Sequence, residues 1–169
     1  MKKLLILSVV AILTSCSQNN KQSTTDQTYD EKISSTSKSL KYEIGSNYFV
    51  KNSFDSSLID KSYIDSKDVF DSIFGVARTM SVESTPTPID FNTDFVIPII
   101  LDQTNIGSKI SIDSISLNGN LLNVNYTVTE VEPISYMIQP SEVIILKKKD
   151  IYDFKNLQLN FKKTTNVLQ

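Results

Sequence analysis

Short runs of alternating apolar and polar residues make up most of the chain between residues 41 and 163. β-Branched and aromatic residues fill these runs, and Gly and Pro separate them. The pattern is typical of β-strands, in which successive side chains point to opposite faces of a sheet. We therefore predict a mainly β domain, a small antiparallel β-barrel or sandwich with one short α-helix.

The clearest hairpin spans residues 109–129 and contains Asn118-Gly119. This dipeptide between alternating strands is typical of a type I′ turn, because both central positions of that turn need a positive φ. The alternation slips by one residue at Asp113-Ser114, which predicts a β-bulge. The buried face of the returning strand is predicted to consist of Leu122, Val124, Tyr126 and Val128.

Further strands are predicted at residues 48–50, 95–101, 142–146 and 156–161. The run 95–101 is almost continuously apolar, which favours a strand covered on both faces. Pro98 lies inside this run and has no backbone N–H, so it indicates an edge strand or a bulge.

One helix is predicted to begin after Ser66 as its N-cap and to end before Gly75 in the left-handed αL conformation. Asp68 falls in the first turn, where a negative charge is favourable. The apolar stripe of this helix is predicted to be Val69, Phe70, Ile73 and Phe74.

The start of the chain is typical of an export signal. Two lysines precede an apolar run at residues 4–13, which is too short to span a membrane. The sequence LTSC at residues 13–16 resembles the bacterial lipobox. This resemblance implies that residues 1–15 are removed and that Cys16, the only cysteine, carries fatty acids such as palmitate. The alternative is a secreted protein in which this cysteine has no such role.

The rest of the chain divides into three parts. Residues 16–40 are almost entirely polar and predict a flexible membrane tether. Residues 41–163 then form one β-rich domain, and residues 164–169 a C-terminal tail. Ser17 follows the lipidated cysteine in place of an Asp, so lipoprotein sorting implies the outer membrane, with the domain in the periplasm or on the surface.

Charge and composition exclude several functions. Without residues 1–15 the chain carries 15 basic and 19 acidic residues, which argues against a nucleic-acid partner. Histidine is absent and Cys16 is used by the anchor, so catalytic triads and the usual zinc sites are excluded. A carboxylate pair or a Ser-Lys dyad stays open, although no spacing singles one out. We expect no enzyme, no cofactor and no metal.

Two segments outside the strands have competing interpretations. The basic cluster 147–149 is either a solvated turn or a contact with a membrane surface. Residues 76–90 form the longest irregular stretch, which Pro86 and Pro88 stiffen. An extended loop with Arg78 and Met80 suits a protease cleft, because proteases bind chains in β geometry. A plain connection that covers one end of the domain is the structural alternative.

Four runs carry a family resemblance: NYFV at 47–50, FDSIFGVARTM at 70–80, TPIDF at 87–91 and FVI at 95–97. They resemble small lipobox-bearing proteins of Gram-negative bacteria, among them the potempin-type protease inhibitors. The similarity covers roughly residues 47–146 and rests mainly on fold-forming residues. These include Phe70, Phe74, Gly75 and Phe91.

The resemblance implies non-catalytic inhibition of a secreted metallo or serine endopeptidase. The contact is assigned to Arg78, Thr79 and Met80, with Pro86 and Pro88 as supports. A second contact is assigned to residues 132–139, expected between strands. The alternative is an envelope lipoprotein that binds a peptide, a glycan or a partner protein through Tyr136, Met137 and the polar face of the hairpin.

Overall fold

A computed structural model describes residues 37–55, 62–77 and 85–168 of the chain. All of them belong to one compact unit, residues 34–169. The predicted signal peptide 1–15, Cys16 and most of the predicted tether lie outside the described residues.

The described residues form three sheets and one helix. The four-stranded sheet has the order β1 (Lys38–Ser39), β6 (Thr104–Asn118), β7 (Leu121–Ile138) and β9 (Gln158–Val167). The three-stranded sheet has the order β2 (Glu43–Ile44), β8 (Ser141–Lys147) and β5 (Asp94–Ile100). The two-stranded sheet joins β3 (Tyr48–Val50) to β4 (Phe74–Val76). Helix α1 spans Lys67–Ile73, and the 3-10 turns η3 (Lys148–Asp150) and η4 (Phe154–Asn156) lie between β8 and β9.

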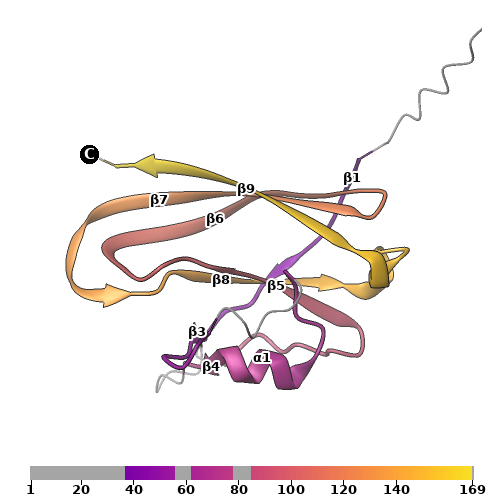
Figure 1. Cartoon of the computed structure of the whole chain (residues 1–169), viewed down its shortest axis with the longest axis horizontal. Helices are drawn as coiled ribbons and strands as arrows, with labels where there is room; N and C mark the ends of the chain where they lie inside the picture. Colours follow the sequence, from indigo (N-terminus) through magenta and orange to yellow (C-terminus); the bar gives the residue numbers. More distant parts are fainter. Residues whose placement is uncertain (1–36, 56–61, 78–84, 169) are drawn as a thin grey trace, which may run out of the picture. The chain divides into compact units, whose positions relative to one another are not determined.

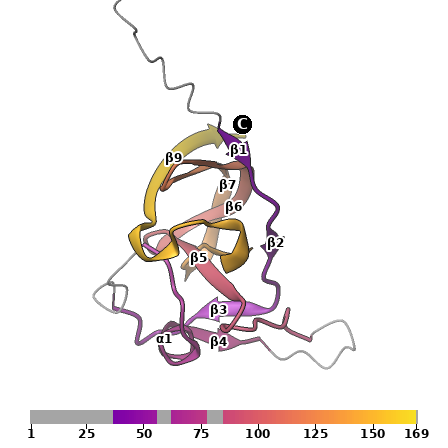
Figure 2. The ribbon, with the colours of Figure 1, turned by 90° about the vertical axis from the view of Figure 1, so that its right-hand side faces the viewer.

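These elements lie in layers (Figure 1). The four-stranded sheet covers one side of the three-stranded sheet, and α1 with the two-stranded sheet covers the other side. Figure 2 shows β2 on the path from β1 in the first layer to β3 in the third. The mainly β prediction is confirmed, and because the sheets do not close into a barrel, the arrangement is consistent with a sandwich.

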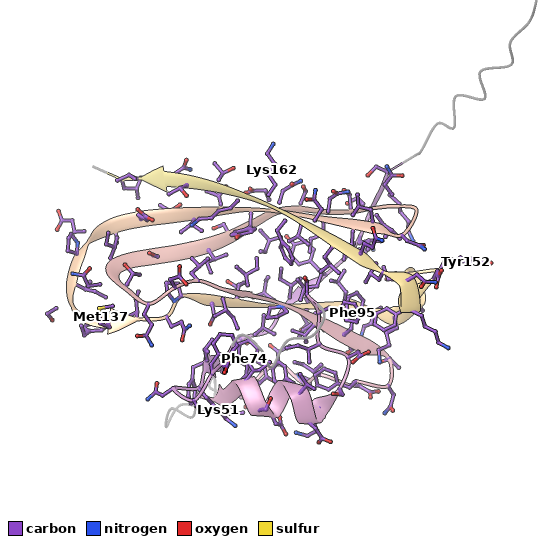
Figure 3. The ribbon with its side chains drawn as sticks, in the orientation of Figure 1. Lys51, Phe74, Phe95, Met137, Tyr152 and Lys162 are labelled. Carbon is purple, nitrogen blue, oxygen red and sulfur yellow. The ribbon has the colours of Figure 1, made fainter. Side chains whose placement is uncertain are left out.

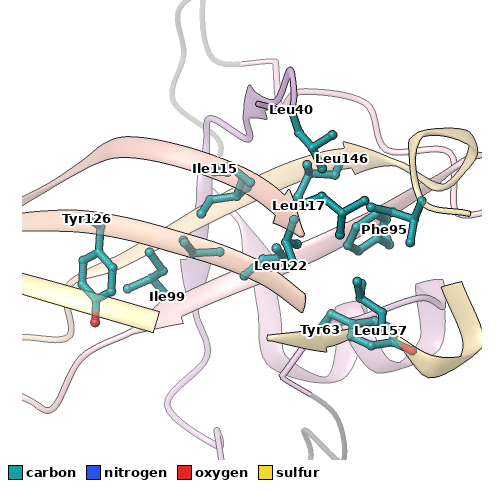
Figure 4. Packing of buried hydrophobic residues seen from close by; sticks show 14 of the residues in the cluster. Leu40, Tyr63, Phe95, Ile99, Ile115, Leu117, Leu122, Tyr126, Leu146 and Leu157 are labelled. Atoms are coloured by element: carbon teal, nitrogen blue, oxygen red, sulfur yellow. The ribbon is translucent and has the colours of Figure 1, made fainter. Parts of the chain in front are cut away.

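The three-stranded sheet separates two hydrophobic cores. Phe95, Ile97 and Ile99 of β5 point into the core beneath the four-stranded sheet, where Ile115, Leu117 and Leu122 meet them (Figure 4). Val96 and the alternate residues of β8, Val143 and Ile145, point into the second core with Phe70 and Phe74. The apolar run is therefore buried on both faces, as its composition predicts. Figure 3 shows Phe95 between the layers.

Pro98 lies on an edge strand, one of its two predicted positions. β5 pairs with β8 on one side, and on the other side Val96 exchanges backbone hydrogen bonds of 2.8 and 2.7 Å with Ile64. Peptide groups alternate in direction along an antiparallel strand, so position 98 faces the same outer edge as Val96. The missing N–H of Pro98 therefore costs no hydrogen bond to β8.

The β6–β7 hairpin has the predicted bulge but a different turn. The register shifts between Ile112 and Ser114, and the predicted face of β7 is buried. Asn118 pairs with Leu121, so the central residues are Gly119 and Asn120 and not Asn118-Gly119. Gly119 has φ +59°, whereas Asn120 has no positive φ. The type I′ prediction is therefore wrong, and positive φ at the first central position alone is the requirement of a type II′ turn.

β9 pairs with β7 in parallel, from Leu121 opposite Gln158 to Glu130 opposite Val167. The antiparallel expectation is wrong for this strand, because the chain crosses to β8 in the other sheet before it returns. The predicted strand 156–161 begins later and is longer than expected.

The boundaries of the domain are also wider than expected. β9 continues into the predicted tail 164–169. At the other end, β1 and the buried Leu40 lie within the predicted tether 16–40, and the N–H of Leu40 donates to Ile115 at 2.9 Å.

Helix α1 begins after Ser66 as predicted, although the Ser66 side chain makes no capping bond. Its end differs, because Phe74 is already extended and Gly75 lies inside β4 without a positive φ. Gly75 pairs with Phe49, and a Cβ at Gly75 would lie 2.5 Å from the Phe49 ring. Glycine is therefore needed here for close contact and not as a helix cap. Val69 is partly exposed, so it does not belong to the buried face of the helix as the sequence predicted.

Asp94 is the buried charged residue in the described part of the chain, with 3% of its surface exposed. Its carboxylate accepts hydrogen bonds from Lys147 Nζ at 2.7 Å and Thr93 Oγ1 at 2.9 Å. Burial would raise the pKa of Asp94, but these bonds and the N–H of Asp90 outweigh it and hold the pKa below its usual value. The pair joins β5 to β8, since Asp94 and Lys147 are opposite in the ladder.

We predict that Asp94→Asn lowers the free energy of unfolding at pH 7 by about 1–2 kcal/mol, because charge-assisted bonds to a buried group are lost. A carboxylate with a depressed pKa stabilises the fold above the pKa of the unfolded state, about 4, and this contribution disappears as the pH falls through the folded pKa. The difference between the two proteins in urea unfolding should therefore shrink below about pH 4.

Asp71→Asn is the matched control for this prediction, because Lys67 and Asp71 form an exposed ion pair on α1. Exposed pairs contribute little, so this variant should unfold like the parent at pH 7. An Asp94→Asn difference that stays constant from pH 7 to pH 3 would contradict the ion-pair explanation.

Candidate functional site

The described ends of the predicted functional loop meet at one place, the start of β3. Ser46 and Asn47, which lie between β2 and β3, and Tyr48, the first residue of β3, form what we call the loop anchor. Ala77 directly follows β4, and residues 85–90 return toward β5 without regular structure. Both ends are bonded to the loop anchor.

Asn47 holds both ends at once. Its carbonyl oxygen accepts the N–H of Ala77 at 2.9 Å, and its side-chain Nδ2 donates to the carbonyl of Thr85 at 3.1 Å. Asn47 has φ +63°, a left-handed conformation that Asn tolerates better than most residues. This backbone geometry and the amide side chain together fix where the loop leaves the domain and where it returns.

Thr87 secures the returning end through its main chain and its side chain. Its Oγ1 accepts the N–H of Ser46 at 3.0 Å and lies 2.9 Å from the Ser46 hydroxyl, while its N–H donates to the Ser46 carbonyl at 3.3 Å. The Tyr48 hydroxyl donates to the Thr87 carbonyl at 2.6 Å. Pro86 and Pro88 flank Thr87, and each restricts the preceding residue to extended geometry. The two prolines thus act where the bonds to the anchor are concentrated.

An aromatic cluster packs against the Tyr48 side chain of the loop anchor. The Tyr48 ring meets Phe70 of α1 edge to face at 5.0 Å, and Phe70 also contacts Phe74 at 4.9 Å and Phe91 at 5.6 Å. Burial raises the pKa of the Tyr48 phenol above its usual value, so the hydroxyl stays protonated and can donate to Thr87. The loop ends therefore rest on the packed second core.

No protein-family model matches the chain. Comparisons with curated proteins and with solved structures also give no significant match. The site is therefore interpreted from its own geometry.

The contact residues Arg78, Thr79 and Met80 and the lipidation site Cys16 lie outside the described residues. Pro86 and Pro88 are described, and both belong to the returning end. The loop anchor was not predicted from the sequence. Its only local signal is Ser46-Asn47 between two apolar segments, a pair typical of turns, whereas its partners are far away in sequence.

The second predicted contact, residues 132–139, is not a connection between strands. β7 continues to Ile138, with Pro133 opposite Ile106 and Ile138 opposite Thr104. The prediction that this stretch lies between strands is therefore wrong. Tyr136 and Met137 are nevertheless exposed, at 65% and 61%.

The basic cluster 147–149 has a structural role that neither interpretation anticipated. Lys147 binds Asp94, and Lys148 Nζ donates to the carbonyls of Phe91 and Asp65 and lies 5.6 Å from the centre of the Phe154 ring. Two of the three lysines therefore connect segments that are distant in sequence.

Within residues 37–55, 62–77 and 85–168, no group of three or more Asp, Glu, Cys or His side chains could hold a metal ion. In the same residues no helix is long and apolar enough to cross a membrane. The described site supplies hydrogen bonds that hold the two ends of a loop in a fixed geometry.

Two variants at position 47 separate the contributions of this residue. Asn47→Gly keeps the positive φ but removes the bond to Thr85, and we expect it to lower the free energy of unfolding by about 1 kcal/mol. Asn47→Ala loses the same bond and also puts alanine, which tolerates the left-handed conformation less well than Asn or Gly, at this position, which adds about 1 kcal/mol. Urea unfolding of the three proteins tests this order. Equal stability of all three would contradict the bridging role of Asn47.

Proposed function

We propose that this chain is a lipid-anchored outer-membrane protein that inhibits a secreted metallo or serine endopeptidase through the loop that carries Arg78, Thr79 and Met80. The observation that carries the proposal is the attachment of both loop ends to Asn47. The resemblance of the sequence to potempin-type inhibitors supports it and stays a prediction.

An anchored loop suits inhibition for an energetic reason. A protease cleft binds an extended chain, and ordering a free chain at an interface costs about 0.5–1.5 kcal/mol for each immobilised side chain. Bonds that fix both loop ends in the free protein reduce this cost. Thr87 and its two neighbouring prolines add rigidity on the returning side. The inhibitor would bind by preorganised backbone, with a few contact side chains that dominate the affinity.

Attachment to the membrane follows from the proposed lipid on Cys16. Such an anchor would concentrate the inhibitor at the cell envelope, where a secreted protease of the same cell or of a host would meet it. The domain would act in the periplasm or at the surface. No catalytic step is part of this proposal.

Binding of a peptide, a glycan or a partner protein without inhibition is the second candidate. A groove beside β3, with the exposed Phe49 and Met137 in its lining, favours this candidate. None of the described loop residues lines this groove, whereas Tyr48 of the loop anchor does.

The test titrates the full chain into a panel of secreted metallo and serine endopeptidases and measures residual activity. We expect stoichiometric inhibition of at least one enzyme. Replacement of Arg78, Thr79 and Met80 by Gly should raise the inhibition constant by about 100-fold or more, since hot-spot side chains are lost. Asn47→Gly leaves the contact residues unchanged and should raise the constant by about tenfold, because the loop loses one of its attachments.

Tyr152→Ala is the matched control, because Tyr152 is fully exposed on the connection between β8 and β9 (Figure 3). This variant should inhibit like the parent. No inhibition of either protease class by the folded chain would rule out the proposed activity. Inhibition that survives the triple replacement would show that the loop is not the contact.

A further inference from the structure

A groove of about 710 Å³ lies between β3 and the junction of β7 with β8. We call it the β3–β8 slot. Its walls come from segments far apart in sequence, since Phe49 and Asn52 face Gln103, Met137 and Gln139. Figure 3 shows Met137 at the end of the domain opposite to Tyr152.

One wall of the slot is the edge of β3 that does not pair with β4, which we call its outer edge. The carbonyl of Asn47 and the N–H of Lys51 bond to Ala77 and Ile73, so the odd-numbered positions of β3 face β4. The peptide groups of Tyr48 and Val50 alternate with them and face the opposite edge. In the described part of the chain no strand pairs with that edge. Tyr48 and Val50 are among the residues that line the slot, and their side chains pack against the second core.

The opposite wall offers a second unpaired backbone segment. The carbonyl of Val143 accepts the N–H of Gly45 at 2.7 Å, so the odd-numbered positions of β8 face β2. Pairing on this side ends at Gly45, because the chain turns away at Ser46. Ser141 therefore points its N–H and C=O into the slot with no strand opposite.

The side chains that line the slot are uncharged. Apart from Tyr48 and Val50, they comprise the carboxamides of Asn52, Gln103 and Gln139, the Ser141 hydroxyl, and the apolar groups of Phe49, Met137 and Ile138. Phe49 is 47% exposed and rests on Gly75, whose missing Cβ makes room for the ring, and Met137 is 61% exposed. A charged ligand would find no counter-ion here, whereas a neutral chain would find hydrogen-bond donors, acceptors and apolar contacts.

We infer that the β3–β8 slot binds an uncharged peptide segment in extended conformation, which adds as a strand to the outer edge of β3. The peptide groups of Tyr48 and Val50 supply the main-chain hydrogen bonds, and Ser141 supplies a further pair. Phe49 and Met137 contact alternate side chains of the peptide. This inference does not depend on the inhibitory loop.

The backbone arrangement favours a peptide over a sugar. Tyr48 and Val50 present N–H and C=O groups two residues apart, which is the repeat of a pairing strand. A second copy of this chain is a poor occupant, because its own β3 edge also lines a groove and would have to enter the slot together with the residues around it. A single extended segment of another protein enters the slot alone and pairs with the three residues of β3.

The experiment screens the full chain against an array of uncharged peptides of about eight residues, with cellotetraose and chitotetraose as neutral sugars. The best peptide is titrated, and amide hydrogen exchange is measured with and without it. We expect slower exchange at Tyr48, Val50 and Ser141. Phe49 should change less, because its N–H already faces β4.

Two pairs of variants test one backbone contact and one apolar contact of the slot separately. Ser141→Pro removes one N–H that no strand uses, at the first residue of β8 where proline is tolerated, and should weaken peptide binding by about tenfold. Ser141→Ala keeps the N–H and should bind within about twofold of the parent. Met137→Ala should weaken binding by about fivefold, whereas Tyr136→Ala, next to it but outside the slot, should not.

Three outcomes would overturn the inference. The first is the absence of any peptide that binds the folded chain. The second is binding of cellotetraose or chitotetraose in place of peptides. The third is peptide binding that leaves exchange at Tyr48, Val50 and Ser141 unchanged, which would put the peptide elsewhere. Protease inhibition could succeed or fail independently of all three.

Discussion

Burial of β5 and β8 on both faces is the constraint on which the rest of this structure depends. These two strands place alternate residues in two cores, so the residues in their centres are apolar and each face needs its own cover. The four-stranded sheet covers one face. The other face holds α1 and the two-stranded sheet, and the start of β3 carries the loop anchor. The position of the candidate site is thus a consequence of how the second core is closed.

Features with local causes could be predicted from the sequence. The bulge at Asp113, the start of α1 after Ser66 and the edge position of Pro98 all follow from one residue and its neighbours. Two glycines were misinterpreted, because their roles depend on pairing. Gly119 takes the first central position of the turn since Asn118 pairs with Leu121, and Gly75 is required by the Phe49 ring across the ladder.

Contacts between distant residues explain what the sequence could not predict. The bond from Asn47 to Thr85 spans 38 residues, and although Ser46-Asn47 has the composition of a turn, nothing near either residue marks the other as its partner. The same holds for the parallel pairing of β9 with β7, which depends on a crossing through the other sheet. Loop length and the two prolines indicated a functional segment, but the residues that hold it lie in a different part of the chain.

The shared attachment of both loop ends separates the loop from the fold that carries it. Ala77 and Thr85, on either side of this segment, both bond to Asn47, and the two cores of the described residues contain neither of them. The closure entropy of such a loop grows slowly, by about 0.6 kcal/mol for each doubling of its length. Insertions, deletions and substitutions in this segment would therefore change its length and chemistry while the residues of the two cores stay the same.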